Sequence, residues 1–242
     1  MFSVGDSSAT WARQSKLNVF FQTSVVSTND WAKEKAFGSE LATSPISLFL
    51  TEEQTHGRGR GNHSWSQNSP SSALLSSWVF ELPRPPRSVV TCRIGLAVEK
   101  ALTATWPWLH FSLKAPNDIY IGKKKLGGIL VENLQQGKAN CLIIGLGLNV
   151  FESPDLPLAT SLFENLKDER FLSAIDWEAF LDRLFLELSL AVSLSAEALS
   201  SSEQMALLSA LNKKVDLPEK FISVEADGTL ITAQNRIHWS EL

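Results

Sequence analysis

Cysteine is scarce in this chain of 242 residues: there are only two, Cys92 and Cys141, and both stand in apolar stretches. So few cysteines exclude a disulfide-stabilised secreted scaffold and predict two reduced, buried thiols, as in a cytoplasmic protein. The chain also lacks a basic N-terminal segment followed by an apolar one, and no window approaches the roughly 20 apolar residues of a membrane span. We therefore expect neither secretion nor a membrane partner.

An excess of positive charge is missing as well. The 22 lysines and arginines are outnumbered by 26 aspartates and glutamates, which gives a formal net charge of -4. Such a surface does not attract polyanions as a whole, so nucleic acid is not an expected partner. Two nucleotide-binding motifs are incomplete: Gly145-Leu146-Gly147 lacks the third glycine of the dinucleotide motif, and Gly122-Lys123 lacks the following serine or threonine of a P-loop.

The chain does contain short apolar stretches of strand type, followed by helical patterns without regular alternation. This order predicts an α+β fold, a mixed sheet with helices packed on it. We expect a large domain over residues 1–211 and a small C-terminal β unit over 212–242. The expected strands are 17–21, 46–50, 73–80, 111–114, 119–121, 126–134 and 141–150, with a basic turn at 123–125 and a β unit over 221–239, and the expected helices are 27–38, 88–103, 176–199 and one ending at 211.

A stretch rich in glycine and arginine connects two of the expected strands. It reads Gln54-Thr55-His56-Gly57-Arg58-Gly59-Arg60-Gly61 and is followed by Trp65. Glycine lets the backbone approach a ligand closely, and guanidinium groups offer forked donors that match phosphate or carboxylate oxygens. The stretch predicts a loop that folds over a phosphate-bearing ligand. Similar stretches occur in disordered nucleic-acid-binding segments and in solvated loops, so alone it leaves these alternatives open.

Three further clusters combine polar residues and glycines. They are Ser27-Thr28-Asn29 at an expected helix start, the segment from Lys114 to Asp118 between two short strands, and Lys125-Leu126-Gly127-Gly128 together with the strand that holds Gly145 and Asn149. Each has an ordinary structural explanation. A helix cap, a tight turn, a solvated basic turn and close sheet packing explain them one by one.

Taken together and in this order, the four clusters resemble the catalytic domain of biotin protein ligases, which activate biotin with ATP and attach it to a lysine of a carboxylase carrier domain. The resemblance covers residues 17–149. It implies a fold similar to class II synthetases, with a largely antiparallel mixed sheet, flanking helices and a short SH3-like C-terminal β unit. Because only 26 residues precede Ser27, we expect a monofunctional ligase without a DNA-binding domain.

The resemblance also implies which residues bind biotin. The ureido ring of biotin carries one carbonyl and two N–H groups, which need hydrogen-bond partners when they are buried. Hydroxyl and amide side chains suit that task. The implied biotin-binding residues are Ser27, Thr28, Asn29, Gln54, Gly57, Arg58, Lys125, Gly127, Gly128 and Gly145.

Activation requires the biotin carboxylate to attack the α-phosphorus of ATP, so cations must gather negatively charged groups. By resemblance, the catalytic residues are Arg60, Lys125 and Asp118, and Mg²⁺ comes with ATP near Asn117 and Asp118. The second step, attack by a carrier lysine on biotinyl-AMP, needs no covalent enzyme nucleophile. The expected partner is a biotin carboxyl carrier protein, and a homodimer is left open. The implied nucleotide-binding residues are Arg58, Arg60, Trp65, Asn117 and Asn149.

The chain departs from the family pattern at Ala115, where relatives usually have tryptophan. Loss of this aromatic side chain leaves open a biotin-binding protein without turnover. A lipoate or octanoate ligase or transferase of the same architecture is a second alternative, although Arg60 and the Lys125-Leu126-Gly127-Gly128 segment argue against it. The C-terminal segment is also shorter than the family's SH3-like domain.

Overall fold

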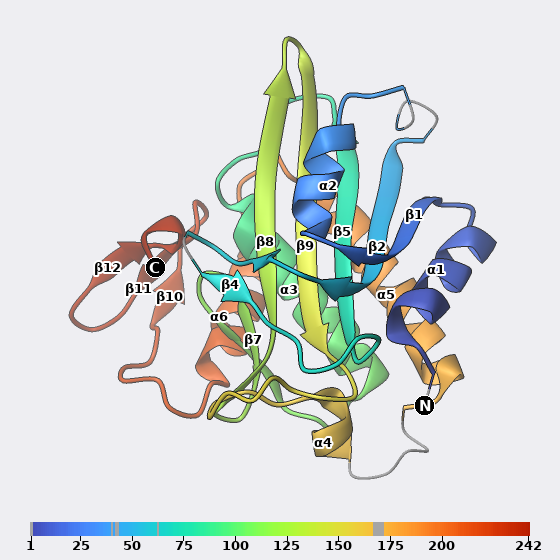
Figure 1. The fold of residues 1–242 in the computed structure, drawn as a ribbon. Coiled ribbons are helices and arrows are strands. Elements are labelled where there is room, and N and C mark those ends of the chain that lie inside the picture. The colour runs from blue at the N-terminus through green and yellow to red at the C-terminus, as the bar shows by residue number, and fades with distance from the viewer. Residues whose placement is uncertain (1, 40, 42–43, 62, 167–171) are drawn as a thin grey trace. The chain divides into compact units, whose positions relative to one another are not determined.

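The computed structural model describes residues 2–39, 41, 44–61, 63–166 and 172–242 (Figure 1). The chain divides into two compact units. The first consists of Met1–Pro85 and Leu126–Leu181, and the second of Pro86–Lys125 and Asp182–Leu242. The expected domain boundary between residues 211 and 212 stays a prediction.

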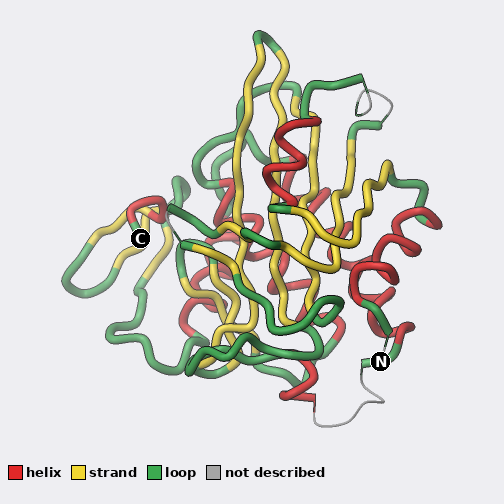
Figure 2. The backbone as a smooth tube through the Cα atoms, viewed as in Figure 1, coloured by secondary structure: helices red, strands yellow, loops and turns green. Residues whose placement is uncertain are grey.

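Five strands of the first unit lie side by side in the order β1-β2-β5-β9-β8. β1 and β2 run parallel, and the other neighbours are antiparallel. The mixed, largely antiparallel sheet expected from the sequence is thus confirmed. Figure 2 shows β8 and β9 as two long neighbouring strands joined by a tight turn. The strands are β1 (Asn18–Val25), β2 (Ile46–Gln54), β5 (Ala73–Leu82), β8 (Lys124–Gln136, in this unit from Leu126) and β9 (Ala139–Asn149).

Helix α2 (Thr28–Lys35) packs across the sheet against β2, β5 and β9 (Figure 1). It begins at Ser27, which is the N-cap expected from the sequence. Its buried face places Ala32 against Phe49 and Ile143 in one apolar cluster. This packing fixes the start of α2 over the middle of the sheet, where the polar residues of the predicted site lie.

Helix α1 (Val4–Gln14) has no counterpart among the expected elements. Gly5 and Ser8 weaken its helical pattern, because glycine and serine are poor helix formers. Packing against β1 and β2 compensates, and the Trp177 indole donates a 3.0 Å hydrogen bond to the Ser8 hydroxyl. Tertiary contacts therefore stabilise this helix more than its local sequence does.

Three short elements of the first unit also lie outside the expectations. β3 (Gly57–Arg58) and β4 (Ser64–Trp65) pair with each other in an antiparallel ribbon, within the segment expected to be an irregular loop. α4 (Leu162–Leu166) is a single helical turn after β9. The β3–β4 pairing matters most, since it fixes the base of the glycine- and arginine-rich loop.

The second unit combines helices with two small sets of strands. The expected helices and strands are present, and the C-terminal β unit is a three-stranded sheet in the order β10-β11-β12. It turns at Gly228, whose φ of +90° suits glycine. The elements are α3 (Val90–Thr105), β6 (Phe111–Lys114), β7 (Asp118–Ile121), α6 (Ser201–Asn212), β10 (Ser223–Val224), β11 (Thr229–Ile231), β12 (Arg236–His238) and a final 3-10 turn η2 (Trp239–Glu241).

Helix α5 (Ala174–Ser193) ends earlier than residue 199, so that expectation was wrong. The reason lies in Arg93, whose guanidinium is only 3% exposed and donates to the carbonyl oxygens of Leu194 (2.7 Å) and Ala198 (3.0 Å). Carbonyls that accept from a side chain do not need the next helical turn. Arg93 also pairs with Glu203 of α6, with an Nε–Oε1 distance of 2.5 Å.

Both cysteines are buried and unpaired, as the sequence predicts. Burial raises the pKa of the Cys141 thiol to about 12 and also raises the pKa of Cys92. Neither thiol is therefore an activated nucleophile near neutral pH. Among the helices that the structure describes, none is long and apolar enough to cross a membrane.

Candidate functional site

The start of α2 brings three polar residues to the sheet, and they have different tasks. The Ser27 hydroxyl accepts a hydrogen bond from the Asp30 N–H and caps the helix. Thr28 instead contacts β2, because its N–H donates to Gln54 Oε1 at 2.8 Å. Asn29, only 3% exposed, faces β5, β8 and β9. Helix capping therefore explains Ser27 but neither Thr28 nor Asn29.

Asn29 lies directly over Gly145 of β9. A β-carbon at position 145 would come within 2.3 Å of Asn29 Oδ1, so only glycine leaves room for this side chain. The same oxygen accepts a hydrogen bond from Ser77, the register partner of Gly145 in β5. The Ser77 oxygen also lies 2.9 Å from the Thr28 hydroxyl. Ser77 was not among the predicted residues, and its only sequence signal is a serine pair inside an otherwise apolar strand.

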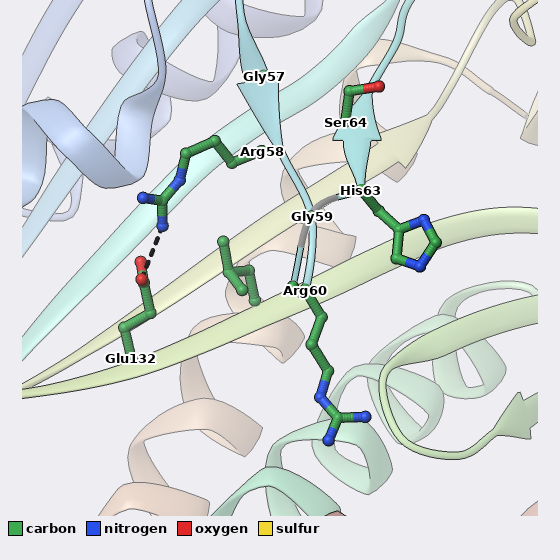
Figure 3. Close-up of a pocket in the computed structure, with 9 residues that line it drawn as sticks. Gly57, Arg58, Gly59, Arg60, His63, Ser64 and Glu132 are labelled. Carbon is green, nitrogen blue, oxygen red and sulfur yellow. Dashed lines mark hydrogen bonds and ion pairs between the residues drawn. The ribbon is translucent and has the colours of Figure 1, made fainter. Parts of the chain in front are cut away.

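Three donors converge on Glu132 of β8, and Figure 3 shows one of them, Arg58. Lys33 Nζ (2.6 Å) and Arg58 Nη2 (2.7 Å) contact its Oε1, and Asn29 Nδ2 (2.8 Å) contacts its Oε2. Burial alone would raise the pKa of Glu132, but the hydrogen bonds from these three side chains outweigh it and lower the pKa. Arg58 also pairs with Asp30 through a 2.9 Å contact. Sequence analysis missed Glu132, Lys33 and Asp30.

A pocket of about 530 Å³ opens beside this cluster. Figure 3 shows that Arg58 points toward Glu132, whereas Arg60 extends away from it. The two arginine side chains of the loop therefore lie along different parts of the pocket. The lining residues are Gly57, Arg58, Gly59, Arg60, Gly61, His63, Ser64, Leu130 and Glu132.

The Trp65 ring lies against Gly147, which shares a face of β9 with Gly145. A β-carbon at position 147 would lie 2.6 Å from the ring. Gly57, the partner of Trp65 in the β3–β4 ribbon, leaves no room for a β-carbon either, because one would lie 2.8 Å from the Trp65 carbonyl oxygen. The buried Trp65 indole N–H has no hydrogen-bond partner in the described part of the chain. It is a donor that a ligand can use.

Asn149 ends β9 with a second incompletely paired group. Its Nδ2 donates to the Thr160 carbonyl oxygen at 3.0 Å. Its Oδ1 is buried and accepts no hydrogen bond from any residue that the structure describes. A buried acceptor without a donor is uncommon and suits a ligand N–H group.

The glycines of β8 have a different explanation. A β-carbon at Gly127 would lie 2.8 Å from the Gly147 carbonyl oxygen, so the backbone of β9 itself excludes it. Gly128 is the register partner of Gly147 in the same pair of strands. Close strand packing accounts for Gly127, and its predicted contact with biotin stays a prediction.

In the second unit, Lys125 and Asp118 form an ion pair with an Nζ–Oδ1 distance of 2.7 Å. Asp118 begins β7, and Asn117 is in the turn just before it. The Trp239 indole donates a 2.7 Å hydrogen bond to the Pro116 carbonyl oxygen and so anchors this turn. That these residues face the same ligand as Asn29 and Arg58 stays a prediction.

The basic turn expected over residues 123–125 needs a correction. Lys124 and Lys125 already belong to β8, and only Lys123 lies in the turn. Strand geometry and the Asp118 carboxylate hold Lys125, although its side chain is still 38% exposed. A loosely solvated lysine is therefore not an adequate description of this residue.

Protein groups for a metal ion are few. Within the described residues, no group of three or more histidines, cysteines, aspartates or glutamates is arranged to hold one. Asp118 and the Asn117 amide supply at most a few oxygen ligands, and Lys125 already engages Asp118. Enzymes commonly bind Mg²⁺ through one or two carboxylates and the phosphates of the substrate, and a magnesium ion near Asn117 and Asp118 stays a prediction.

The model of the biotin/lipoate A/B protein ligase family matches residues 22–149, just over half of the chain and the segment that holds every predicted site residue. The chain belongs to this family. Two relatives match it at 32% identity: the biotin--[acetyl-CoA-carboxylase] ligase of Mycobacterium tuberculosis over 48% of this chain and 45% of that protein, and the chloroplastic biotin--protein ligase 1 of Arabidopsis thaliana over 43% and 29%. The chain thus spans less than half the length of these curated relatives.

The fold of the chain is similar to that of solved biotin protein ligase structures. The biotin protein ligase from Aquifex aeolicus in complex with biotin and ATP has a TM-score of 0.65 at 23% identity, covering 93% of this chain and 97% of that one. The Leishmania major enzyme in complex with biotinyl-5-AMP has a TM-score of 0.63 at 24% identity, covering 90% and 96%. The expected fold class is confirmed.

Proposed function

We propose that the protein is an ATP-dependent biotin protein ligase, which converts biotin to biotinyl-AMP and transfers it to a lysine of a biotin carboxyl carrier protein. One observation carries the proposal: Asn29 and Arg58 both contact the Glu132 carboxylate, so a neutral amide and a guanidinium lie within reach of one small molecule. Biotin has the matching ends, a neutral ureido ring and an acid. The names of the relatives support the choice of biotin.

Thr28, Asn29 and Gln54 pair with the ureido ring in this proposal. They offer hydroxyl and amide groups beside Gly145, whose lack of a side chain leaves room for Asn29 over β9. These groups bond to one another and to Ser77. A ring with one carbonyl and two N–H groups can replace those internal bonds one for one, so that no buried polar group is left unpaired. The remaining residues proposed to line the biotin site are Ser27, Gly57, Lys125, Gly127 and Gly128.

Arg58, Arg60 and Lys125 serve the first step. A biotin carboxylate oxygen attacks the α-phosphorus of ATP, the bond to the bridging oxygen breaks and pyrophosphate leaves. The cations lower the repulsion between the acid and the phosphates and stabilise the charge that develops. Asn117 and Asp118 carry the protein oxygens that would hold Mg²⁺, which would supply neutralisation of phosphate charge. Trp65 and Asn149 offer an unused N–H and an unused carbonyl oxygen to the nucleotide.

The second step transfers biotin to the carrier. The neutral amine of a carrier lysine attacks the anhydride carbonyl, an amide bond forms, AMP leaves and the amine loses a proton. Asp118 is the residue proposed to hold the incoming amine. Neither cysteine is needed, in keeping with the raised thiol pKa values. We further propose a cytoplasmic enzyme that acts on a carboxylase of the same compartment.

The test combines the purified chain with biotin, ATP, Mg²⁺ and a carrier domain, with lipoate in a parallel reaction. We expect biotin-dependent release of pyrophosphate and a biotin adduct on one carrier lysine, both read by mass spectrometry. Lipoate should give neither product. An adduct with lipoate alone would refute the proposal and favour the other branch of the family.

Ala115 supports one alternative, a protein that binds biotin without turnover. It replaces the tryptophan usual in relatives and sits directly between Lys114 and Pro116, before the Asn117-Asp118 turn. Tight biotin binding without any pyrophosphate release would favour that alternative. Introduction of Ala115→Trp should then restore release.

A further inference from the structure

Glu132 contacts both Asn29, which is proposed to bind the ureido ring, and Arg58, which is proposed to bind the acid group. Its Oε2 accepts from the Asn29 amide at 2.8 Å, and its Oε1 accepts from Arg58 at 2.7 Å and from Lys33 at 2.6 Å. The Glu132 side chain is 22% exposed and stands at the edge of the pocket. A carboxylate in this position can influence how both Asn29 and Arg58 meet a ligand.

The orientation of the Asn29 amide depends on this carboxylate. An ionised carboxylate accepts hydrogen bonds and cannot donate them, so the Asn29 nitrogen must face Glu132 and its oxygen must face Ser77 and Gly145. The low pKa of Glu132 keeps it ionised at neutral pH. The amide therefore has one fixed orientation, with its carbonyl oxygen over Gly145 and toward Ser77.

Arg58 is held in a different way. Among the described residues, its guanidinium pairs with the side chains of Glu132 and Asp30, and the Arg58 side chain is 38% exposed beside the pocket. Ion pairs at such exposure are weak and can be exchanged for another anion at small cost. Lys33 stays on Glu132 when Arg58 leaves, so the carboxylate does not become unpaired.

We propose that Glu132 is a positioning residue: it fixes the orientation of the Asn29 amide and holds Arg58 in reserve until the acid group of the ligand takes the guanidinium over. The proposal rests on the proposed function in so far as biotin is the ligand. It adds that binding of the acid releases Arg58 from Glu132. Glu132 touches neither reacting atoms nor ATP in this proposal.

A first test needs no ligand. Brief trypsin treatment, read by mass spectrometry, measures cleavage after Arg58 through the fragments 1–58 and 59–242. In Glu132→Gln the Arg58 guanidinium loses one of its two charged partners and keeps only the exposed pair with Asp30, so cleavage should become about ten-fold faster. Glu34→Gln is the matched control, because Glu34 is an exposed glutamate of the same helix as Asn29 and Asp30. Equal cleavage rates in Glu132→Gln and the unmodified chain, at equal melting temperatures, would overturn the proposal.

A second test uses biotin and its uncharged methyl ester, with affinities measured by calorimetry. In Glu132→Gln the ester should bind about ten-fold more weakly, because Asn29 loses its fixed orientation. Biotin should lose only about three-fold, because Arg58 no longer has to leave a carboxylate. The ratio of biotin to ester affinity therefore rises, which a general loosening of the fold would not produce. Equal losses for both ligands would contradict the proposal.

The two tests separate this inference from the proposed function. If the unmodified chain binds neither biotin nor its ester, the proposed function fails, and the trypsin result alone decides whether Glu132 holds Arg58. If biotin binds but neither test responds to Glu132→Gln, the proposed function stands and the role of Glu132 is refuted.

Discussion

Two arginine–glutamate pairs in this protein use the same chemistry in opposite ways. In the second unit, Arg93 and Glu203 are 3% and 15% exposed, and Arg93 also bonds to backbone carbonyls of the chain after α5. In the first unit, Arg58 and Glu132 are 38% and 22% exposed and bond to side chains beside a pocket. A pair tied to the backbone holds the fold, whereas a pair tied only to side chains can change partners.

The two glutamates, Glu203 and Glu132, also differ in the groups that they contact. Glu203 belongs to a capping box with Ser200, so its carboxylate also stabilises the start of α6. Glu132 belongs to no cap and instead shares its oxygens among Lys33, Asn29 and Arg58. We therefore expect changes at the first pair to reduce stability and changes at the second to reduce ligand binding.

The largest expected effect is on stability. Arg93→Met should lower the free energy of unfolding by about 3–5 kcal/mol, because it removes the cation that pairs with Glu203 and leaves the carbonyl oxygens of the segment after α5 without this donor. Urea denaturation followed by tryptophan fluorescence measures the change. A loss below about 1 kcal/mol would mean that water replaces the guanidinium and that this pair is no more structural than Arg58–Glu132.

One glycine in each unit tests whether the first unit binds the ligand while the second contributes stability. Gly145→Ala should weaken biotin binding by about 2–3 kcal/mol, since its β-carbon would displace Asn29 from the sheet. Gly95→Ala in α3 is the control, because its β-carbon would meet only Leu113 at 3.8 Å. It should leave binding unchanged and raise stability by about 0.5–1 kcal/mol. Calorimetry with biotin and thermal melting distinguish the two, and full binding by Gly145→Ala would separate Asn29 from the ligand site.

Local patterns in the sequence predict much of the fold. The strands of the sheet and the start of α2 follow from apolar periodicity and from the Ser27 cap, which act over a few residues. Helix α1 does not follow, because its helix formers are weak and its stability comes from contacts such as Trp177–Ser8, far apart in the chain. The early end of α5 also depends on a distant residue, Arg93.

Some residues of the candidate site are likewise predictable from the sequence and others are not. Motif order and resemblance give Asn29, Arg58 and Gly145, because each stands in a recognisable short segment. They do not give Ser77 or Glu132, whose bonds to Asn29 span 48 and 103 residues of sequence. The serine pair in β5 and the glutamate in β8 do not indicate in the sequence which distant residue they contact, so only the folded sheet identifies Asn29 as their partner.

Low pH should have the next largest effect, a loss of the stability that the Arg93–Glu203 pair contributes. Burial alone would raise the pKa of Glu203, but bonds from Arg93 and Ser200 lower it to about 2. A lowered pKa gives stability that is present above the usual value near 4.5 and is lost as the pH falls toward about 2. After allowance for screening by water, this loss amounts to about 1–2 kcal/mol. Glu203→Gln should flatten that part of the stability–pH curve, and an unchanged slope would assign the acid sensitivity to other carboxylates.

The smallest expected effect is the stability change of Arg58→Met, the variant that corresponds to Arg93→Met in the other pair. Arg58→Met should change the free energy of unfolding by less than about 1 kcal/mol, because an ion pair at this exposure contributes little and Lys33 still pairs with Glu132. Urea denaturation under the conditions used for Arg93→Met gives a direct comparison. The same variant should lose affinity for biotin but keep more of its affinity for the methyl ester, which has no acid for Arg58 to hold. A stability loss as large as that of Arg93→Met would show that the two pairs are alike and that Arg58 is not held for exchange.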